Sequence, residues 1–159
     1  MKLKSFAEMD CSLAQALEVV GERWTLLILR DAFFGIRRFE EFQRRLGIAR
    51  NILSVRLARL VDAGILERHA VSAGGKWAEY RLTEKGRTLQ PALLALTQWG
   101  DCWYPPETGV RVEFLERSTG RPIRPLRPCA EDGRELEPGE IRARSSRANP
   151  ASDSASEAE

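Results

Sequence analysis

Apolar residues recur three and four positions apart through much of the first sixty residues. This spacing over 11–20 predicts an amphipathic helix, and the segment 22–34, which is apolar on more sides, predicts a central helix covered by its neighbours. Two shorter amphipathic segments follow at 39–46 and 50–63, joined by Gly47. Two short helices joined at a glycine are typical of a helix-turn-helix, so the sequence predicts that motif here.

A β-hairpin is predicted directly after the second short helix. The segments 65–71 and 78–82 are strand-like, and Gly74-Gly75 between them allows the positive φ that a tight reversal requires. A hairpin in this place is typical of the wing of a winged helix-turn-helix, which we therefore expect over 65–82.

A long helix is predicted from Glu84 to about Tyr104. Thr83 is a suitable N-cap for it, and leucines and tryptophans follow one side of the helix. Pro91 lies inside this segment and lacks the backbone N–H, so we expect a kink or a break there.

The chain changes character after this helix. Residues 110–115 alternate like a strand and glycine turns follow, so small hairpins are expected over 109–141. From 145 onward Ser, Ala, Asp and Glu dominate, which predicts disorder. The predicted architecture is α+β and mainly α, with a winged helix-turn-helix DNA-binding and dimerisation domain at 1–104, a small β-rich extension at 105–144 and a disordered tail at 145–159.

Composition narrows the class of protein. The 159 residues, 43% hydrophobic and 30% charged, provide one domain with a core and an appendage, without room for a second catalytic domain. No apolar run approaches the roughly 18 residues of a membrane span, and the first residues lack the apolar stretch of a signal peptide. A cytoplasmic protein without a membrane partner is expected.

The net charge of +2 conceals a split along the chain. Residues 37–87 carry a net charge of +6, whereas residues 105–159 carry −2. A basic segment inside a nearly neutral protein is the electrostatic footprint of binding to phosphates. A solvated basic surface would have the same composition, so charge alone does not decide between the two.

Residues for catalysis or metal binding are scarce. Cys11, Cys102 and Cys129 are far apart and never form a C-x-x-C pair, and His69 is the single histidine. The chain has no G-x-S-x-G, phosphate loop or H-E-x-x-H motif. We expect a protein that is not an enzyme and that holds no metal and no cofactor.

The side of the second short helix opposite its leucines is the candidate for reading DNA. With the leucines turned inward, a rotation of about 100° per residue turns a second set of positions outward. Arg pairs with guanine edges, Asn pairs with adenine, and Val packs on the thymine methyl group. The residues of this helix predicted to contact DNA are Arg50, Asn51, Ser54, Val55 and Arg59.

Other basic residues flank this helix along the chain. Arg37 and Arg38 precede the helix-turn-helix, and Arg68 and Lys76 belong to the predicted wing. We expect these four residues to contact the DNA backbone, which gives affinity without sequence information. Each of them singly is equally compatible with solvated surface.

The last long helix carries more aromatic surface than a small core can hold. We expect Leu96, Trp99 and Trp103, together with the first helix, to form the interface of a homodimer. A two-fold dimer also suits two DNA half-sites on the order of 34 Å apart. The expected partners are therefore double-stranded DNA and a second copy of the chain.

Several blocks of the sequence resemble, in order, the HxlR family of winged-helix regulators, which is related to MarR. The blocks cover about residues 10–104 and are Gly21-Glu-Arg-Trp24, TLLILRDAFFGIRRFEEF, GIARNILSVRLARLVDAGILER and EYRLTEKGRTLQPALLALTQWG. The resemblance implies a dimeric DNA-binding repressor or activator, with the helix at 50–63 in the major groove and the hairpin at 65–82 as the wing.

The resemblance also bears on the roles of Cys11 and Cys129. Some members of the family sense electrophiles or oxidants through a cysteine just before the first helix, where the helix N-terminus favours the reactive thiolate. Cys11 occupies that position, and the alternative is a small buried residue kept for packing. In relatives with a C-terminal extension that part resembles a zinc ribbon, but Ser118-Thr119-Gly120 has no cysteine and Cys129 has no partner, so no metal is expected there.

Two alternatives stay open at this stage. A winged helix can serve as a protein-interaction module without sequence-specific DNA binding, with the acidic C-terminal part covering the basic face. A small-molecule or electrophile effector could bind between the DNA-binding part and the tryptophan-bearing helices and change the distance between two recognition helices.

Overall fold

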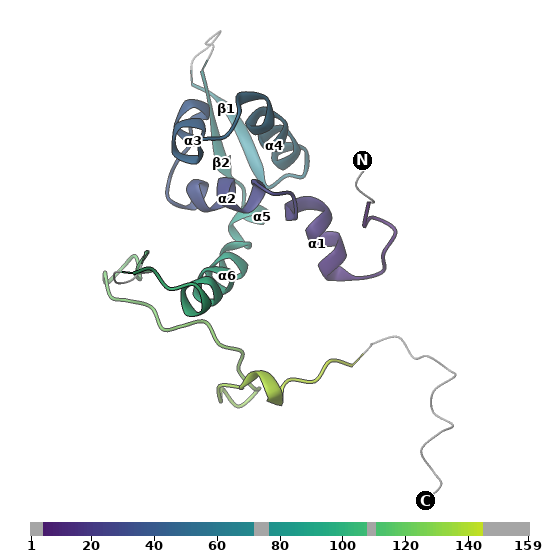
Figure 1. The fold of residues 1–159 in the computed structure, drawn as a ribbon, viewed down its shortest axis with the longest axis vertical. Helices are drawn as coiled ribbons and strands as arrows, with labels where there is room; N and C mark the ends of the chain where they lie inside the picture. Colours follow the sequence, from purple (N-terminus) through teal and green to yellow (C-terminus); the bar gives the residue numbers. More distant parts are fainter. Residues whose placement is uncertain (1–4, 72–76, 108–110, 145–159) are drawn as a thin grey trace, which may run out of the picture.

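The computed structural model describes residues 5–71, 77–107 and 111–144. Lys76 and the predicted disordered tail at 145–159 lie outside these ranges. In Figure 1, α2, α3, α4 and the hairpin form one body, α1 stands to one side of it, and the extension continues beyond α6. The elements are α1 (Ser12–Val20), α2 (Thr25–Phe33), α3 (Phe39–Leu46), α4 (Arg50–Asp62), β1 (Leu66–Ala70), β2 (Ala78–Leu82), α5 (Glu84–Arg87), α6 (Gln90–Trp103) and the 3-10 helix η1 (Pro138–Glu140).

The predicted winged-helix architecture is confirmed. The chain is mainly helical and carries a two-stranded antiparallel sheet directly after the second helix of the helix-turn-helix. None of the helices in the described part of the chain has the length and the apolar run that a bilayer crossing demands.

Leucines on one side of α4 form the centre of the core. Leu53, Leu57 and Leu60 are fully buried, as their spacing predicts. They pack with side chains from α2, α3 and β1, namely Ile28, Leu29, Phe42 and Leu66. Burial of this stripe fixes the rotation of α4 and turns its opposite side to solvent.

A charged side chain is fully buried where α2 meets α3. Asp31 of α2 is 0% exposed, and its carboxylate accepts hydrogen bonds from two arginines. Arg30 Nη2 lies 2.8 Å from Oδ1, and Arg45 Nε of α3 lies 3.3 Å from Oδ2. The carboxylate therefore joins the central helix to the first helix of the helix-turn-helix.

The central helix begins three residues later than its apolar pattern predicts. The pattern places its start at Glu22, but α2 begins at Thr25, after a turn in which the Thr25 N–H donates to the Glu22 carbonyl. The Glu22 side chain is bound to arginines of α4, 34 and 37 positions away in the sequence. A partner that distant leaves no trace in the local pattern of apolar residues.

The wing is connected to the segment that leads into the helix-turn-helix. β1 and β2 pair residue by residue along their whole length. On the other side of β2, Arg38 forms an isolated bridge with Glu79, and the Tyr80 N–H donates to the Arg37 carbonyl at 2.8 Å. The α2–α3 connection thus adds a strand-like piece to the hairpin.

The predicted long helix is divided, as Pro91 indicates. α5 is a single turn of helix, and α6 begins at Gln90 with Pro91 in its first turn, where a backbone N–H needs no partner. Thr83 is the N-cap of α5, as predicted, because its Oγ1 accepts a hydrogen bond from the Gly86 N–H at 3.0 Å.

The extension consists of two tight turns where hairpins were expected. Gly120 and Gly133 have φ values of 67° and 84°, the left-handed conformation that glycine adopts at low cost. Each turn is closed by one isolated bridge, between Leu115 and Pro122 and between Cys129 and Glu135. The turns were thus predicted correctly, and the strands beside them were not.

Prolines explain why no strands form beside these turns. The predicted strand 110–115 alternates in polarity, but its described residues from 111 on form only the bridge at Leu115. The returning segment contains Pro122, Pro125 and Pro128, and proline has no N–H to donate to a ladder.

Side-chain hydrogen bonds hold the first of the two turns. The hydroxyls of Ser118 and Thr119 donate to the carboxylate of Glu116 at 2.5 and 2.6 Å. These hydrogen bonds lower the pKa of Glu116 from its ordinary value of 4.5. The turn is therefore closed by a carboxylate and two hydroxyls where a zinc ribbon would have cysteines.

Candidate DNA-binding surface

The side of α4 that faces away from the core is exposed over its first two turns. Asn51, Ser54 and Val55 all reach solvent, as the helix angle predicts. α4 lies beside the wing at one end of the body (Figure 1). A helix presented in this way can enter the major groove of duplex DNA and bring an amide, a hydroxyl and a methyl-bearing group to base edges.

Arg59 is exposed but is engaged within the chain. Its Nη1 lies 2.8 Å from Oε1 of Glu22, and Arg56 Nη2 lies 2.8 Å from the other oxygen of the same carboxylate. The Arg56 side chain is 16% exposed and that of Arg59 is 61% exposed. A phosphate therefore competes with Glu22 for Arg59, which reduces what this residue can add to DNA affinity.

Arg37 and Arg38 lie where the α2–α3 connection meets β2. Both side chains are exposed; the Arg37 carbonyl accepts a hydrogen bond from the Tyr80 N–H of β2, and Arg38 lies opposite Glu79 in an isolated bridge. The pKa of Glu79 is lowered from 4.5 by the hydrogen bond from Arg81, with further attraction from Arg81, Arg37 and Arg38. The two predicted backbone-contacting arginines are thus held at fixed places on the wing.

Arg50 and Arg68 lie close to one another although 18 positions separate them. Both are exposed and both line a hollow between α3, α4 and the wing. Trp77 lines the same hollow and was not predicted as a site residue. Its place directly before β2, at the end of the turn predicted from the sequence, was the available signal.

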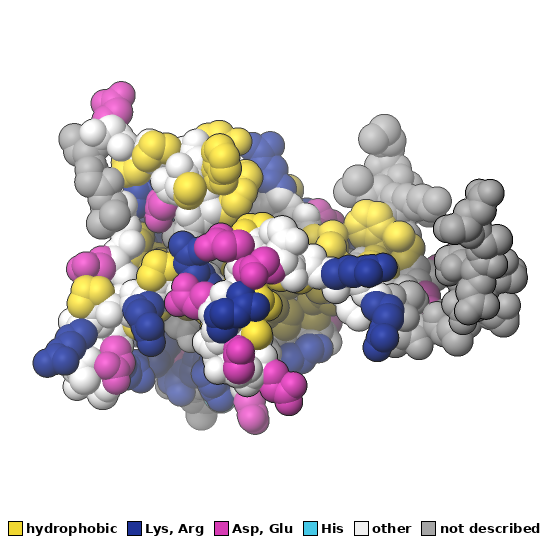
Figure 2. Space-filling view, turned by 90° about the horizontal axis from the view of Figure 1, so that it is seen from below, with side chains coloured by type: hydrophobic (Ala, Val, Ile, Leu, Met, Phe, Trp, Pro, Cys, Tyr) yellow, Lys and Arg dark blue, Asp and Glu magenta, His cyan; other side chains and the backbone are white. Residues whose placement is uncertain are grey.

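Hydrophobic side chains of α6 are left uncovered. Leu96, Trp99 and Trp103 are 53%, 56% and 67% exposed. The Trp99 ring meets Tyr104 edge-on, with 5.7 Å between ring centres, so the aromatic surface is continuous with the end of the helix. Seen from below, hydrophobic side chains reach the surface among charged ones (Figure 2).

α1 adds to this apolar surface. Leu13 and Leu17 are exposed, and Ala14 is the buried residue of this helix. α1 projects from the body formed by α2, α3 and α4 (Figure 1). Exposed apolar surface of this kind can mark an interaction site, and it occurs on the two helices from which a dimer was predicted.

Cys11 is the N-cap residue of α1. Its side chain is exposed, its thiol makes no capping hydrogen bond, and its carbonyl accepts from the Gln15 N–H at 3.0 Å. In the single protomer this thiol is therefore open to reagents. Cys102 and Cys129 are also free and exposed.

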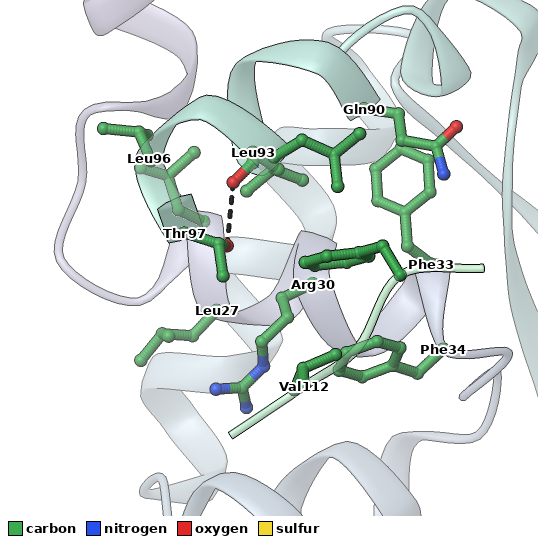
Figure 3. Close-up of a pocket in the computed structure, with 12 residues that line it drawn as sticks. Leu27, Arg30, Phe33, Phe34, Gln90, Leu93, Leu96, Thr97 and Val112 are labelled. Atoms are coloured by element: carbon green, nitrogen blue, oxygen red, sulfur yellow. Dashed lines mark hydrogen bonds between the residues drawn. The ribbon is translucent and has the colours of Figure 1, made fainter. Parts of the chain in front are cut away.

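A small, partly open apolar cavity lies between α2 and α6, and the extension lines part of it (Figure 3). Its lining includes Leu27 and Phe33 of α2, Leu93 of α6 and Val112 of the extension. The Arg30 side chain also lines it. Its volume is about 220 Å³. This is below the roughly 300 Å³ at which drug-sized sites begin, so the cavity suits only a small molecule.

A helix with an exposed polar side, a hairpin wing and arginines around both define this protein as a winged helix-turn-helix transcriptional regulator. The chain belongs to the HxlR-like helix-turn-helix family, whose model matches residues 19–108. The family resemblance carried by the sequence blocks is therefore confirmed.

Relatives of known sequence or structure agree with this assignment. The HTH-type transcriptional regulator Rv3095 of Mycobacterium tuberculosis is 46% identical over 125 residues, 79% of each chain. The crystal structure of PA1607 matches with a TM-score of 0.80 at 40% identity, covering 89% of this chain and 99% of PA1607. The redox regulator HypR in its reduced form matches with a TM-score of 0.55 at 32% identity, over 58% of this chain and 92% of HypR. The family and its members are transcriptional regulators, which confirms that the protein is not an enzyme.

Proposed function

We propose that the protein binds duplex DNA as a homodimer, with α4 in the major groove and the hairpin of β1 and β2 on the backbone or in the minor groove. One observation carries this proposal: an exposed row of Asn51, Ser54 and Val55 lies directly beside the exposed arginines Arg50 and Arg68. Reading of the base sequence needs side chains such as Asn51, Ser54 and Val55, and attraction to phosphates needs arginines.

Each residue has a part in this proposal. Asn51 pairs with an adenine edge, and Val55 packs on a thymine methyl group. Arg37 and Arg38 contact the backbone from the α2–α3 connection, with Lys76 of the wing, which lies outside the described residues. Arg59 contributes once a phosphate displaces Glu22. The 105–144 segment is an appendage to the winged domain at 1–104.

The second copy is proposed to pair through α6 and α1. Leu96, Trp99 and Trp103, with the exposed leucines of α1, supply the apolar surface that such an interface buries. A two-fold axis between the α6 helices would present two α4 helices to successive major grooves, about 34 Å apart.

Affinity for DNA is expected to fall steeply with salt. A dimer that makes about six phosphate contacts loses about 10³-fold in affinity between about 50 and 200 mM salt, because condensed counterions are released on binding. Fluorescence anisotropy with the duplex upstream of its own gene, referred to below as the operator, measures this slope. No binding to the operator, and none to random duplex at low salt, would favour the protein-interaction module instead.

Cys11 is proposed to sense oxidants or electrophiles. The thiol is exposed at the start of a helix that belongs to the proposed dimer surface, and HypR, a structural relative, is a redox regulator. Operator binding by the wild-type chain is expected to change on treatment with a thiol oxidant, and Cys11→Ser is expected to abolish the change. Cys102→Ser is the matched control on α6; a response that persists in Cys11→Ser and disappears in Cys102→Ser would reassign the sensor.

The cavity between α2 and α6 is the proposed site of a small effector. α2 belongs to the DNA-binding body and α6 to the proposed dimer interface, so a ligand wedged between them would change the distance between the two α4 helices. A change in the preferred half-site spacing would report such a movement.

A further inference from the structure

The hollow between α3, α4 and the wing has a volume of about 210 Å³. This is about seven times the roughly 30 Å³ that a water molecule occupies in the liquid, enough for a phosphate group and part of its sugar. Six of its lining residues matter here, namely Phe39, Arg50, Ser54, Arg68, Trp77 and Tyr80. They come from all three elements that a winged helix uses to contact DNA.

Two arginines enter this hollow from different elements. The guanidinium carbon of Arg50 lies 4.8 Å from the centre of the Phe39 ring, which directs the head group from the start of α4 toward α3. Arg68 pairs with Tyr80 across the hairpin and shares the sheet face of Leu66, the residue two positions before it, which is buried in the core. Arg68 therefore continues the inner face of the wing beyond the edge of the core.

Both arginines are free to bind an anion. Within 5–71, 77–107 and 111–144, no ion pair joins Arg50 or Arg68 to a carboxylate. Glu40 also lines the hollow, but neither arginine is within ion-pair distance of it among these residues. With two guanidinium groups and the one carboxylate of Glu40, the hollow has a net positive charge. The hydroxyl of Ser54 can also donate a hydrogen bond to an anion.

Trp77 supplies an apolar wall at the rim. Its side chain is 61% exposed, although a large aromatic ring is usually covered when the chain can cover it. An indole beside two arginines offers a flat apolar surface for a sugar and an N–H donor for a phosphate oxygen.

We propose that this hollow binds one phosphodiester group of duplex DNA, clamped by Arg50 and Arg68, with Trp77 packed against the adjoining deoxyribose. The proposal rests on the proposed DNA-binding function and deepens it. It makes Arg50 a backbone-contacting residue, although it stands at the start of the recognition helix, and leaves base readout to Asn51 and Val55.

The test compares variants on the operator and on a set of its single-base-pair changes, by anisotropy across a salt series. Because a homodimer carries two copies of each substitution and loses two phosphate contacts, Arg50→Gln and Arg68→Gln are each expected to weaken binding about a hundredfold on every duplex and to reduce the salt slope by about two. Asn51→Ala is expected to change the order of preference among the duplexes. Arg124→Gln removes an exposed arginine of the extension and is expected to leave affinity and slope unchanged.

Tryptophan fluorescence tests the third contact independently. DNA binding is expected to alter the emission of the wild-type chain, and Trp77→Phe is expected to lose most of that change while retaining affinity within about threefold. Loss of discrimination at a single base pair in Arg50→Gln, with an unchanged salt slope, would overturn the clamp. An unaltered fluorescence response in Trp77→Phe would overturn the sugar contact. Failure of the wild-type chain to bind any duplex would instead overturn the DNA-binding function itself.

Discussion

Replacing Trp99 and Trp103 together by Ala is expected to give a folded monomer with little remaining affinity for the operator. Both indoles are more than half exposed on α6, so the core of the protomer does not depend on them. Buried tryptophans at the centre of an interface are worth about 2 kcal/mol or more each, and the homodimer loses four of them, which corresponds to about 10⁶-fold in the dimer dissociation constant. Sedimentation velocity at micromolar concentration measures the loss of the dimer, and anisotropy measures the loss of operator binding.

Trp77→Ala is the matched control for that experiment. It removes an equally exposed tryptophan from the wing and is expected to leave the dimer intact. If Trp99→Ala/Trp103→Ala still sediments as a dimer, the interface lies elsewhere, and the exposed apolar residues of the extension become the next surface to test.

Asp31→Ala is expected to lower the free energy of unfolding by about 3 kcal/mol. The carboxylate is fully buried and binds Arg30 and Arg45, so its removal breaks the polar connection between α2 and α3. Breaking a buried ion pair costs about 3–5 kcal/mol, and the lower end applies because both arginine side chains are nearly half exposed and can turn to water. Urea denaturation at fixed protein concentration measures the change.

Asp31→Asn separates the charge from the shape of the side chain. It keeps the volume of the aspartate but places an amide N–H₂ against a guanidinium, so it is also expected to destabilise the protein. A stability equal to that of the wild type in Asp31→Asn would mean that the negative charge of Asp31 contributes no net stabilisation, because the amide oxygen can still accept a hydrogen bond from an arginine.

Local pattern was sufficient to predict the helices and the hairpin. The leucines of α4 at helical spacing are the buried side of that helix, so its exposed side, with Asn51, Ser54 and Val55, was also predicted. Pro91 predicted the division between α5 and α6 because the missing N–H is a local property. The glycines of the extension predicted its turns for a similar reason, since they allow a positive φ.

The local pattern of residues could not predict contacts between residues that are distant in the sequence. Glu22, which precedes the late start of α2, is bound by Arg56 and Arg59, and the guanidinium group of Arg50 lies over the ring of Phe39. Nothing in the local sequence indicated that the charged side chain of Asp31 would be buried. Each of these depends on a pairing that exists only once the helices have packed.

The main-chain bonds between the α2–α3 connection and β2 limit how this protein can be regulated. Because Arg38 bridges Glu79 and Tyr80 donates to Arg37, the hairpin cannot swing without displacing the helix-turn-helix. The helix-turn-helix and the wing therefore move together. In the proposed homodimer, a signal that turns DNA binding on or off is therefore expected to act between this unit and α6, by changing the distance between the two copies of α4.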